Sequence, residues 1–262
     1  MSDVLVSSWT ELQEQLFEGS WQEGLARHRS NFAYRGRSDA NDDLRSSLAR
    51  LGGQTRELER HIVRAFRKYA AAGEVPVDSV WNWLALGQHH GLPTRMLDWT
   101  FSPYVALHFL TSDLSLFDRD GAIWAVDYVR AHALLPAPLS NELEQEGANV
   151  FTTEMLEQAV GGLSGLEQLG EFVLFVEPPS FDERIVNQYA LFSLLSRAEA
   201  SLDEWLDHHP ELLRRIIVPA GLKWEVRDKL DLANLTERVL FPGLDGLSRW
   251  LTRYYLPRAR SS

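Results

Sequence analysis

One segment of the chain, residues 88–110, places polar side chains inside an otherwise apolar stretch, QHHGLPTRMLDWTFSPYVALHFL. Two adjacent histidines, an arginine, an aspartate and several hydroxyl groups lie among leucines and aromatic residues. Polar groups in a buried segment must be paired, because an unpaired polar group away from water costs free energy. We therefore expect this segment to form either a buried structural network or a binding site.

The composition is that of a globular protein, and it limits the chemistry. The 262 residues are 45% hydrophobic and 24% charged, which is enough for a sizeable core. A formal net charge of -11 repels phosphate backbones, so broad nucleic-acid binding is disfavoured. The net charge does not exclude a local basic pocket. The absence of cysteine excludes disulfides, a thiol nucleophile and cysteine zinc sites. No signal peptide or long apolar span is recognisable, so we expect a cytoplasmic protein without a membrane segment.

The spacing of apolar residues predicts an α+β fold, with most helices early and most strands late. The first strand is expected at 32–35, where Gly36 ends it. Later strands are expected at 121–128, 172–176, 184–188 and 215–218. There is no regular alternation of strands and helices, so a doubly wound parallel sheet is disfavoured.

Two local signals mark helix starts clearly. Ser8-Trp9-Thr10-Glu11 has the spacing of a capping box, and Ser102-Pro103 pairs a serine cap with proline at the first helical position. Asp78 is expected to cap a helix that ends before Gly91, and residues 94–102 are expected to connect this helix to the next one. Other helices are expected at 55–71, 201–208, 222–233 and 243–256.

Arg35 is a candidate site residue, because it lies where the first predicted strand ends beside Gly36. Its planar guanidinium matches phosphate or carboxylate groups, and a glycine permits close approach of a ligand to the backbone. The alternative is a structural salt bridge to a carboxylate at the edge of the core. Arg35 taken alone favours the salt bridge.

Residues 94–102 hold the densest set of candidates. Arg95 and Asp98 are close enough in sequence to pair across a turn, and the alternative for Asp98 is to cap the following turn. Trp99 either stacks on a planar ring or fills the core. Thr94, Thr100 and Ser102 supply hydroxyl groups. These groups either orient a ligand or form hydrogen bonds with the backbone of the loop. As a set, these residues predict a lined pocket.

The paired histidines at the end of the predicted helix are not expected to form a metal site. His89 and His90 are adjacent, so on a helix they point about 100° apart, and we expect no metal there. A metal-free hydrolase that uses one of them as a base is an alternative function. Such an enzyme would have a pH–rate profile that changes slope near the usual histidine pKa of about 6.5.

Arg184 and Gln188 lie on the predicted strand at 184–188 and would share one face with Val186. Gln188 is neutral, so it can orient a substrate but cannot act as a general base at neutral pH. The acids of this half of the chain are Glu177, Asp182 and Glu183, and no spacing singles one of them out.

Four motifs of the chain form one pattern. Tyr34-Arg35-Gly36 is an aromatic-Arg-Gly motif, and residues 88–107 read Q-H-x-G-x-P-T-R-x-L-D-W-T-x-S-P-x-x-A-L. Residues 184–188 read R-I-x-x-Q before Phe192, and residues 241–247 read F-P-x-L-D-G-L. Through these motifs the chain resembles the FRG-domain family, which is named for the aromatic-Arg-Gly motif. We expect one FRG-type domain over residues 1–262, with blocks at 32–110 and 172–247 and a candidate helical insert at 131–170.

The motif order of this family is similar to that of ADP-ribosyltransferases. The resemblance implies an α+β fold with a split mixed or antiparallel sheet and an α-helical N-terminal half. It also implies an enzyme that uses NAD as a substrate, either an ADP-ribosyltransferase or an NAD glycohydrolase, and a role as a bacterial toxin or phage-defence effector. The alternative is a non-catalytic module that binds a nucleotide or a protein partner in the same pocket.

The resemblance also implies residue roles. Arg35 would hold the NAD pyrophosphate or ribose, Gln188 would occupy the acidic position, and Asp98 or Glu183 would supply the carboxylate. Tyr34 or Trp99 would form an aromatic platform. The binding set implied beside Arg35, Asp98 and Gln188 consists of Tyr34, Gly36, Gln88, His89, Thr94, Arg95, Trp99, Thr100, Ser102 and Arg184.

Overall fold

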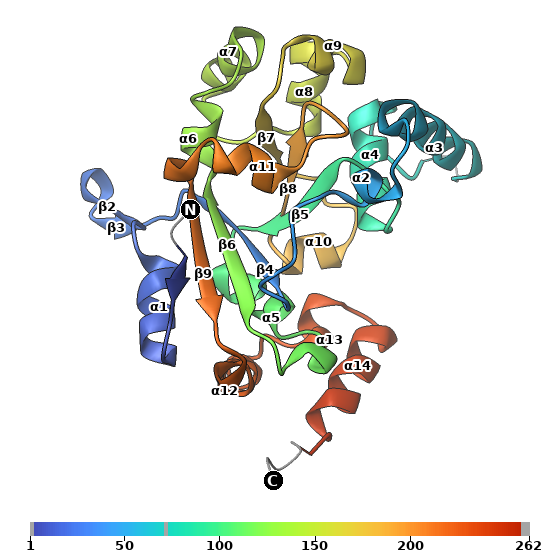
Figure 1. Cartoon of the computed structure of the whole chain (residues 1–262). Helices are drawn as coiled ribbons and strands as arrows, with labels where there is room; N and C mark the ends of the chain where they lie inside the picture. The colour runs from blue at the N-terminus through green and yellow to red at the C-terminus, as the bar shows by residue number, and fades with distance from the viewer. Residues whose placement is uncertain (1–2, 71–72, 258–262) are drawn as a thin grey trace.

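The fold is built on one seven-stranded sheet, seen in a computed structural model that describes residues 3–70 and 73–257 (Figure 1). The strand order is β1-β9-β6-β4-β5-β8-β7, and β1 runs parallel to β9 while the other neighbours are antiparallel. The strands are β1 (Val4–Leu5), β4 (Phe32–Arg37), β5 (Met96–Thr100), β6 (Gly121–Asp127), β7 (Val173–Val176), β8 (Ala190–Leu195) and β9 (Leu213–Val218). A separate ribbon pairs β2 (Trp21–Gln22) with β3 (Arg27–His28). The predicted α+β class with a mixed sheet is therefore confirmed.

Helices cover both faces of this sheet. In the first half they are α1 (Trp9–Phe17), α2 (Ser47–Leu51), α3 (Thr55–Tyr69), α4 (Val80–His89), α5 (Pro103–Leu110) and α6 (Tyr128–His132). In the second half they are α7 (Ala137–Glu146), α8 (Thr153–Val160), α9 (Leu163–Gln168), α10 (Glu183–Asn187), α11 (Leu202–Asp207), α12 (Ala220–Leu232), α13 (Glu237–Leu240) and α14 (Leu244–Tyr254). Helices α7, α8 and α9 occupy most of the predicted insert at 131–170 and gather at one end of the sheet, opposite α12 and α14 (Figure 1). None of the helices in the described ranges is long and apolar enough to cross a membrane.

One face of the sheet carries two separate hydrophobic clusters. Helices α1, α5 and α12 pack on β4, β6 and β9 around Tyr34 and Ile123. Helices α3, α4, α7, α8 and α9 pack on β5, β7 and β8 around Met96 and Leu194. The opposite face carries a third cluster, in which α6 and α11 cover Trp99 and its neighbours. The division of the first face falls between β4 and β5.

The sheet separates at the division between β4 and β5. In the described structure, the ladder between these strands contains the single pair Tyr34–Thr100. By contrast, β5 pairs with β8 along its whole length, and β4 pairs with β6 along its whole length. The residues that follow Tyr34 and those that precede Thr100 therefore face each other across an opening in the sheet.

Two local capping signals, at Ser8 and Ser102, predict helix starts correctly. The Ser8 Oγ accepts a hydrogen bond from the Glu11 backbone N–H at 3.2 Å, and Ser102 accepts one from Val105 at 3.4 Å. The return bond of the predicted capping box goes to Ser7, whose backbone N–H donates to the Glu11 carboxylate at 2.7 Å. These interactions join residues at most four positions apart, so the sequence alone determines them.

Four expectations about secondary structure were wrong. The N-terminal half is not α-helical alone, because it also supplies β4, β5 and β6, three adjacent strands of the sheet. Residues 94–102 do not merely connect two helices, because β5 occupies five of them. Residues 184–188 belong to helix α10 and its end, not to a strand. Ser79 caps α4 in place of Asp78, which accepts a hydrogen bond from the Trp83 indole N–H at 2.8 Å.

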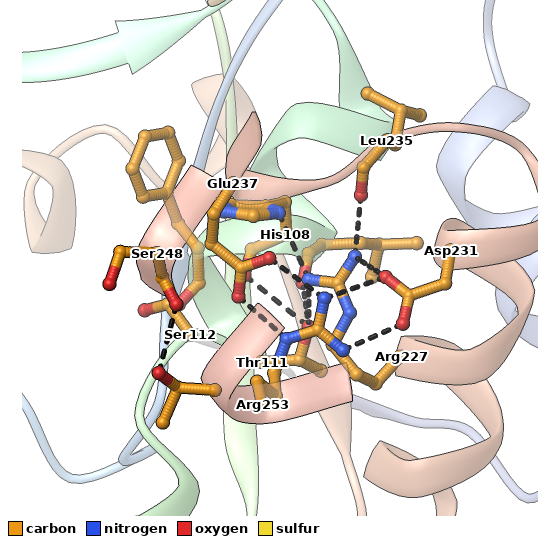
Figure 2. A network of polar contacts seen from close by, with 12 residues as sticks. His108, Thr111, Ser112, Arg227, Asp231, Leu235, Glu237, Ser248 and Arg253 are labelled. Carbon is orange, nitrogen blue, oxygen red and sulfur yellow. Dashed lines mark hydrogen bonds and ion pairs between the residues drawn. The ribbon is translucent and has the colours of Figure 1, made fainter. Parts of the chain in front are cut away.

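A buried polar network fixes the C-terminal helices to α5 (Figure 2). Arg227 Nη1 donates to His108 Nδ1 at 2.9 Å, and Arg227 also pairs with Asp231 at 3.2 Å. Arg253 pairs with Asp231 and with Glu237, each at 2.6 Å. Burial, with the Arg227 charge beside it, lowers the pKa of His108 to about 3, so its ring stays neutral and can accept this bond. The network holds α13 and α14 in place against α5.

Candidate functional site

A cavity of about 390 Å³ lies where β4 and β5 separate. Its wall takes residues from β4, β5, β8, α5 and α10, which lie far apart in the sequence. The predicted residues that line it are Tyr34, Arg35, Gly36, His89, Asp98, Trp99, Thr100, Arg184 and Gln188. The structure thus brings most of the predicted set together, and the opening in the sheet explains why the cavity forms there.

Arg35 crosses the opening between the two strands. Its Nη1 donates to the backbone carbonyl of Asp98 and lies 3.9 Å from the Asp98 carboxylate. The guanidinium thereby satisfies a carbonyl at the part of β5 where the ladder to β4 is missing. Burial lowers the pKa of Arg35 to about 10 while Asp98 opposes the shift, so Arg35 stays charged at neutral pH. Within the described structure its buried Nε has no hydrogen-bond partner.

Asp98 is held in place by a chain of side-chain hydrogen bonds. Thr94 Oγ1 donates to Gln88 Oε1 at 2.6 Å, and Gln88 Nε2 donates to the Asp98 carboxylate at 2.9 Å. The Asp98 side chain remains 61% exposed, so a ligand can reach it. Both expected structural roles of Asp98 were wrong, since it neither pairs with Arg95 nor caps a turn but occupies the middle of β5.

His89 forms a pair with Asp182 at the edge of the cavity. Its Nε2 lies 2.7 Å from Asp182 Oδ2, and its side chain is 7% exposed. Asp182 caps α10 by accepting a hydrogen bond from the Ile185 backbone N–H at 3.1 Å. Burial opposes ionisation of Asp182, but the hydrogen bonds from His89 and the backbone outweigh it and lower its pKa. The sequence analysis did not predict this pair. Aspartate is a preferred helix cap, and this preference could have singled out Asp182 from the neighbouring acid Glu183.

Arg184 and Gln188 connect the cavity to the C-terminal motif. Arg184 Nη1 donates to the His89 carbonyl at 3.3 Å, and its guanidinium carbon lies 5.1 Å from the centre of the Phe241 ring. Gln188 Nε2 donates to the Leu240 carbonyl at 2.9 Å. Because Gln188 holds α13 in this way, its amide acts as a structural link. The expected strand face shared by Arg184, Val186 and Gln188 does not exist, since these residues lie in and after helix α10.

Three predicted ligand contacts are occupied by the protein itself. A Cβ atom at Gly36 would lie 1.8 Å from the Ala106 carbonyl, so glycine admits helix α5 rather than a ligand. The hydroxyl of buried Tyr34 donates to the Leu16 carbonyl at 3.1 Å, and the Trp99 indole N–H donates to Ser193 at 2.8 Å. Both rings pack in hydrophobic clusters, which leaves neither as an open platform for a planar ligand.

Arg95 is a structural residue rather than a site residue. Its Nε donates to Glu59 at 2.7 Å, its Nη1 to the Ser196 carbonyl at 2.8 Å and its Nη2 to Glu167 at 2.8 Å. The Arg95 side chain is 1% exposed and that of Glu59 is completely buried. The expected Arg95–Asp98 pair is therefore wrong, because two acids from α3 and α9 neutralise Arg95 inside the core.

The predicted hydroxyl groups bond within the protein. Thr94 bonds to Gln88, as described above, and is buried. Thr100 Oγ1 donates to the Gln188 carbonyl at 2.7 Å and accepts from the Ser102 backbone N–H at 3.0 Å. Ser102 caps α5. Thr94 thus orients Asp98 through Gln88, and Thr100, which lines the cavity, joins β5 to the end of α10. The hydroxyl groups of all three residues already bond within the protein.

Sequence reasoning overlooked several residues that line the cavity. Arg37 follows Arg35 by two positions on β4, so the period of a strand could have placed both on one face. Arg37 pairs with Asp42 at 2.7 Å. The apolar part of the wall had no sequence signal, because its members come from four separate segments: Phe109, Leu116, Ile185 and Phe192. Across the described ranges, no group of three or more histidines and acids is arranged to hold a metal ion.

Comparison with protein families adds one match. The family model of the FRG domain matches residues 30–119. The chain has an FRG domain. This match includes Tyr34-Arg35-Gly36 and the long motif at 88–107, so the resemblance seen in the sequence is confirmed. No curated protein matches the chain. No solved structure matches it.

The cavity extends beyond the matched part of the FRG domain. Arg35, His89 and Asp98 lie within residues 30–119, whereas Arg184 and Gln188 come from the second half of the chain. The R-I-x-x-Q and F-P-x-L-D-G-L segments meet where the Arg184 guanidinium lies over the Phe241 ring. The FRG domain thus supplies one side of the cavity, and later segments supply the other.

Proposed function

We propose that this FRG-domain protein binds NAD in the cavity between β4 and β5 and cleaves the bond between nicotinamide and ribose. It would act as an NAD glycohydrolase or an ADP-ribosyltransferase. The observation that carries the proposal is the meeting of Arg35 with the accessible carboxylate of Asp98 beside an apolar wall. The split of the sheet and the motif order support a relationship to ADP-ribosyltransferases.

The arginines of the cavity support an anionic ligand. Arg35, Arg37 and Arg184 line it together with the carboxylates of Asp42, Asp98 and Asp113, in a chain that has a net charge of -11 as a whole. A guanidinium offers two parallel N–H donors that match a phosphate. The unpartnered Nε of Arg35 and the similar Nε of Arg184 leave donors for such a ligand within the described structure. A diphosphate would satisfy these donors.

The apolar wall supports a ligand that also has a planar ring. Phe109, Leu116 and Phe192 lie in the same cavity as the arginines. A cavity of about 390 Å³ lies within the range of roughly 300–1,000 Å³ that is usual for nucleotide-sized ligands. A ring beside these side chains and a diphosphate beside Arg35 would place the ribose near Asp98.

The proposed reaction needs a carboxylate and a proton acceptor. When the bond from ribose C1′ to nicotinamide breaks, its electron pair leaves with the nicotinamide ring and positive charge develops on the ribose. Asp98, oriented by Gln88, would stabilise this charge. A water molecule or an acceptor group then forms the new bond to C1′ and loses a proton. His89, oriented by Asp182, would take that proton.

The first test is release of nicotinamide from NAD by the purified protein. Asp98→Asn keeps the size of the side chain but removes its charge, and we expect at least a hundredfold lower turnover, as for other groups that stabilise transition-state charge. Asp207→Asn, an exposed acid that does not line the cavity, is the matched control and should leave turnover unchanged. Wild-type protein that neither binds NAD in calorimetry nor releases nicotinamide would refute the proposal.

One observation favours the alternative of a binding module without catalysis. Asp98 already pairs with Arg35 and Gln88, and the amide of Gln188 is committed to α13. A module would shift the unfolding temperature with NAD or ADP-ribose and release no nicotinamide. Loss of that shift in Arg35→Gln, but not in an exposed control such as Arg64→Gln, would place the ligand in the same cavity.

The biological proposal is that NAD consumption in a bacterial cytoplasm makes this protein a toxin or a phage-defence effector. Expression in bacteria should then lower the cellular NAD level and stop growth. Asp98→Asn expressed to the same level should do neither. Growth arrest that persists in Asp98→Asn would argue against NAD consumption as its cause.

A further inference from the structure

A second, smaller cavity borders the first one. Its volume is about 160 Å³, and it shares Arg35, Arg37 and Asp98 with the larger cavity. Its further walls come from the segment after β4, from α2 and from the end of α4. The charged residues that belong to this cavity alone are Asp43, Arg45 and Arg50.

Positive charge predominates in this small cavity. Four arginines line it, against the carboxylates Asp43 and Asp98, in a chain that is acidic as a whole. One carboxylate, Asp43, serves both Arg45, at 3.8 Å, and Arg50. Glu204 also lies 3.6 Å from Arg45, but its side chain is 68% exposed and it does not line the cavity. Asp42 likewise pairs with Arg37 at 2.7 Å without lining the small cavity. Among the side chains that line the cavity, the arginines therefore outnumber the carboxylates by two, and the other two acidic partners lie outside it.

The concentration of like charge works against the folded protein. Burial is the main cause of the lowered pKa of Arg35; the charges of Arg37 and Arg50 lower it further, while those of Asp98 and Asp42 oppose the shift. In the described structure the buried Nε atoms of both Arg35 and Arg37 have no hydrogen-bond partner. A bound anion would relieve the repulsion and satisfy the Nε of Arg37, which is not one of the donors assigned to the diphosphate.

The volume of the cavity limits what this anion can be. About 160 Å³ is below the range of roughly 300–1,000 Å³ that nucleotide-sized ligands need. A base or a nicotinamide ring belongs in the larger cavity, whereas a single phosphate group suits the smaller one. Guanidinium groups from several directions match the oxygens of a phosphate better than the two oxygens of one carboxylate.

We propose that the small cavity is a subsite for a phosphate monoester, separate from the contacts of the diphosphate in the larger cavity. This phosphate has two chemical sources: an extra phosphate on the same nucleotide, such as the 2′-phosphate of NADP, or a phosphate on the second substrate. The evidence for the subsite is the charge and size of the small cavity, which do not depend on NAD binding. Only the choice between the two sources of the phosphate rests on the proposed function.

Binding of inorganic phosphate tests the subsite without any nucleotide. In a phosphate-free buffer, calorimetry should detect phosphate binding to the wild-type protein, and Arg50→Gln should weaken it about tenfold or more. Arg50 is about half exposed, so loss of its pair with Asp43 should leave the fold intact, which circular dichroism can check. Arg64→Gln removes the same charge from an exposed position on α3 outside both cavities and should bind phosphate like the wild type. Absence of phosphate binding, or equal weakening by both substitutions, would overturn the proposal.

The source of the phosphate follows from the same variants. If Arg50→Gln weakens NADP binding and leaves NAD binding unchanged, the phosphate belongs to the nucleotide. If it leaves both nucleotides unchanged but still weakens phosphate binding at saturating NAD, the phosphate belongs to the second substrate. Equal weakening of NAD and NADP would show that the diphosphate itself uses Arg50, and a separate subsite would be wrong. A protein that binds phosphate but no NAD would refute the proposed function and leave the subsite standing.

Discussion

Replacing Arg95 by methionine should destabilise the protein strongly, because it leaves Glu59 charged and without a countercharge in the core. The Glu59 side chain is completely buried, and Arg95 donates to it from both Nε and the backbone N–H, at 2.7 and 3.0 Å. Breaking a buried ion pair by removing one partner costs about 3–5 kcal/mol. For a protein of this size, such a loss lowers the unfolding temperature by roughly 6–20 °C.

The measurement is thermal and urea unfolding followed by circular dichroism. Arg64→Met, on the same helix as Glu59 but exposed, is the matched control and should change stability by no more than about 0.5 kcal/mol. The double variant Glu59→Gln with Arg95→Met should regain part of the lost stability, because it removes the stranded charge. Glu167 also loses Arg95 in these variants, but it still pairs with Arg56 at 2.5 Å, so it does not have to be replaced as well.

Two results would refute this reasoning about Arg95. A loss of stability no larger than in the control would show that Glu59 finds another partner or takes up a proton without cost. Loss of NAD binding in Arg95→Met at unchanged stability would show that Arg95 contacts the ligand after all.

Three further predictions concern the site and its support. Gly36→Ala should cost about 1–3 kcal/mol in urea unfolding, because its Cβ would meet the Ala106 carbonyl; unchanged stability would mean that α5 moves away freely. Gln88→Ala should lower turnover of NAD roughly tenfold with little change in KM, because Asp98 loses the bond that orients it; an unchanged kcat would contradict that role. His108 stays neutral when folded, so its contribution to stability should be full above about pH 6.5 and fall by about 2 kcal/mol by pH 5, as the unfolded chain gains a proton. His132, whose pKa burial lowers to about 4, should add a similar fall over the same range. His108→Gln should therefore remove about half of the slope, and a slope that the substitution leaves unchanged would contradict this role of His108.

Features that depend on neighbours in the chain were predictable from the sequence. Ser8 and Ser102 cap their helices as expected, because a cap joins residues only two or three positions apart. The first strand at Arg35 was also predicted, with its end near Gly36, and β4 extends only as far as Arg37. The long motif at 88–107 identified the FRG domain for the same reason, since a motif is a local pattern.

Short apolar runs were assigned wrongly because their pattern does not separate a strand from a helix or a connection. Strand β5 has five residues, of which only Asp98 is exposed, so no alternation of apolar and polar residues marked it. Residues 183–187 have a helix cap at Asp182, but the helix is a single short turn with one buried residue, Ile185. For β5 the neighbouring strand β8 decides the conformation, through ladder bonds that the local sequence does not contain.

The sequence by itself therefore determined the α+β class, the helix caps and the family motif, and it pointed to Arg35, Asp98 and His89 as candidates. Only the tertiary structure decided the partner of each one. Arg95 lies three residues from Asp98 yet pairs with Glu59, 36 positions away, while His89 finds Asp182 at a separation of 93. A buried charged group must pair with a group that the packing of the chain brings close to it in space. Spacing along the chain does not determine that distance in space.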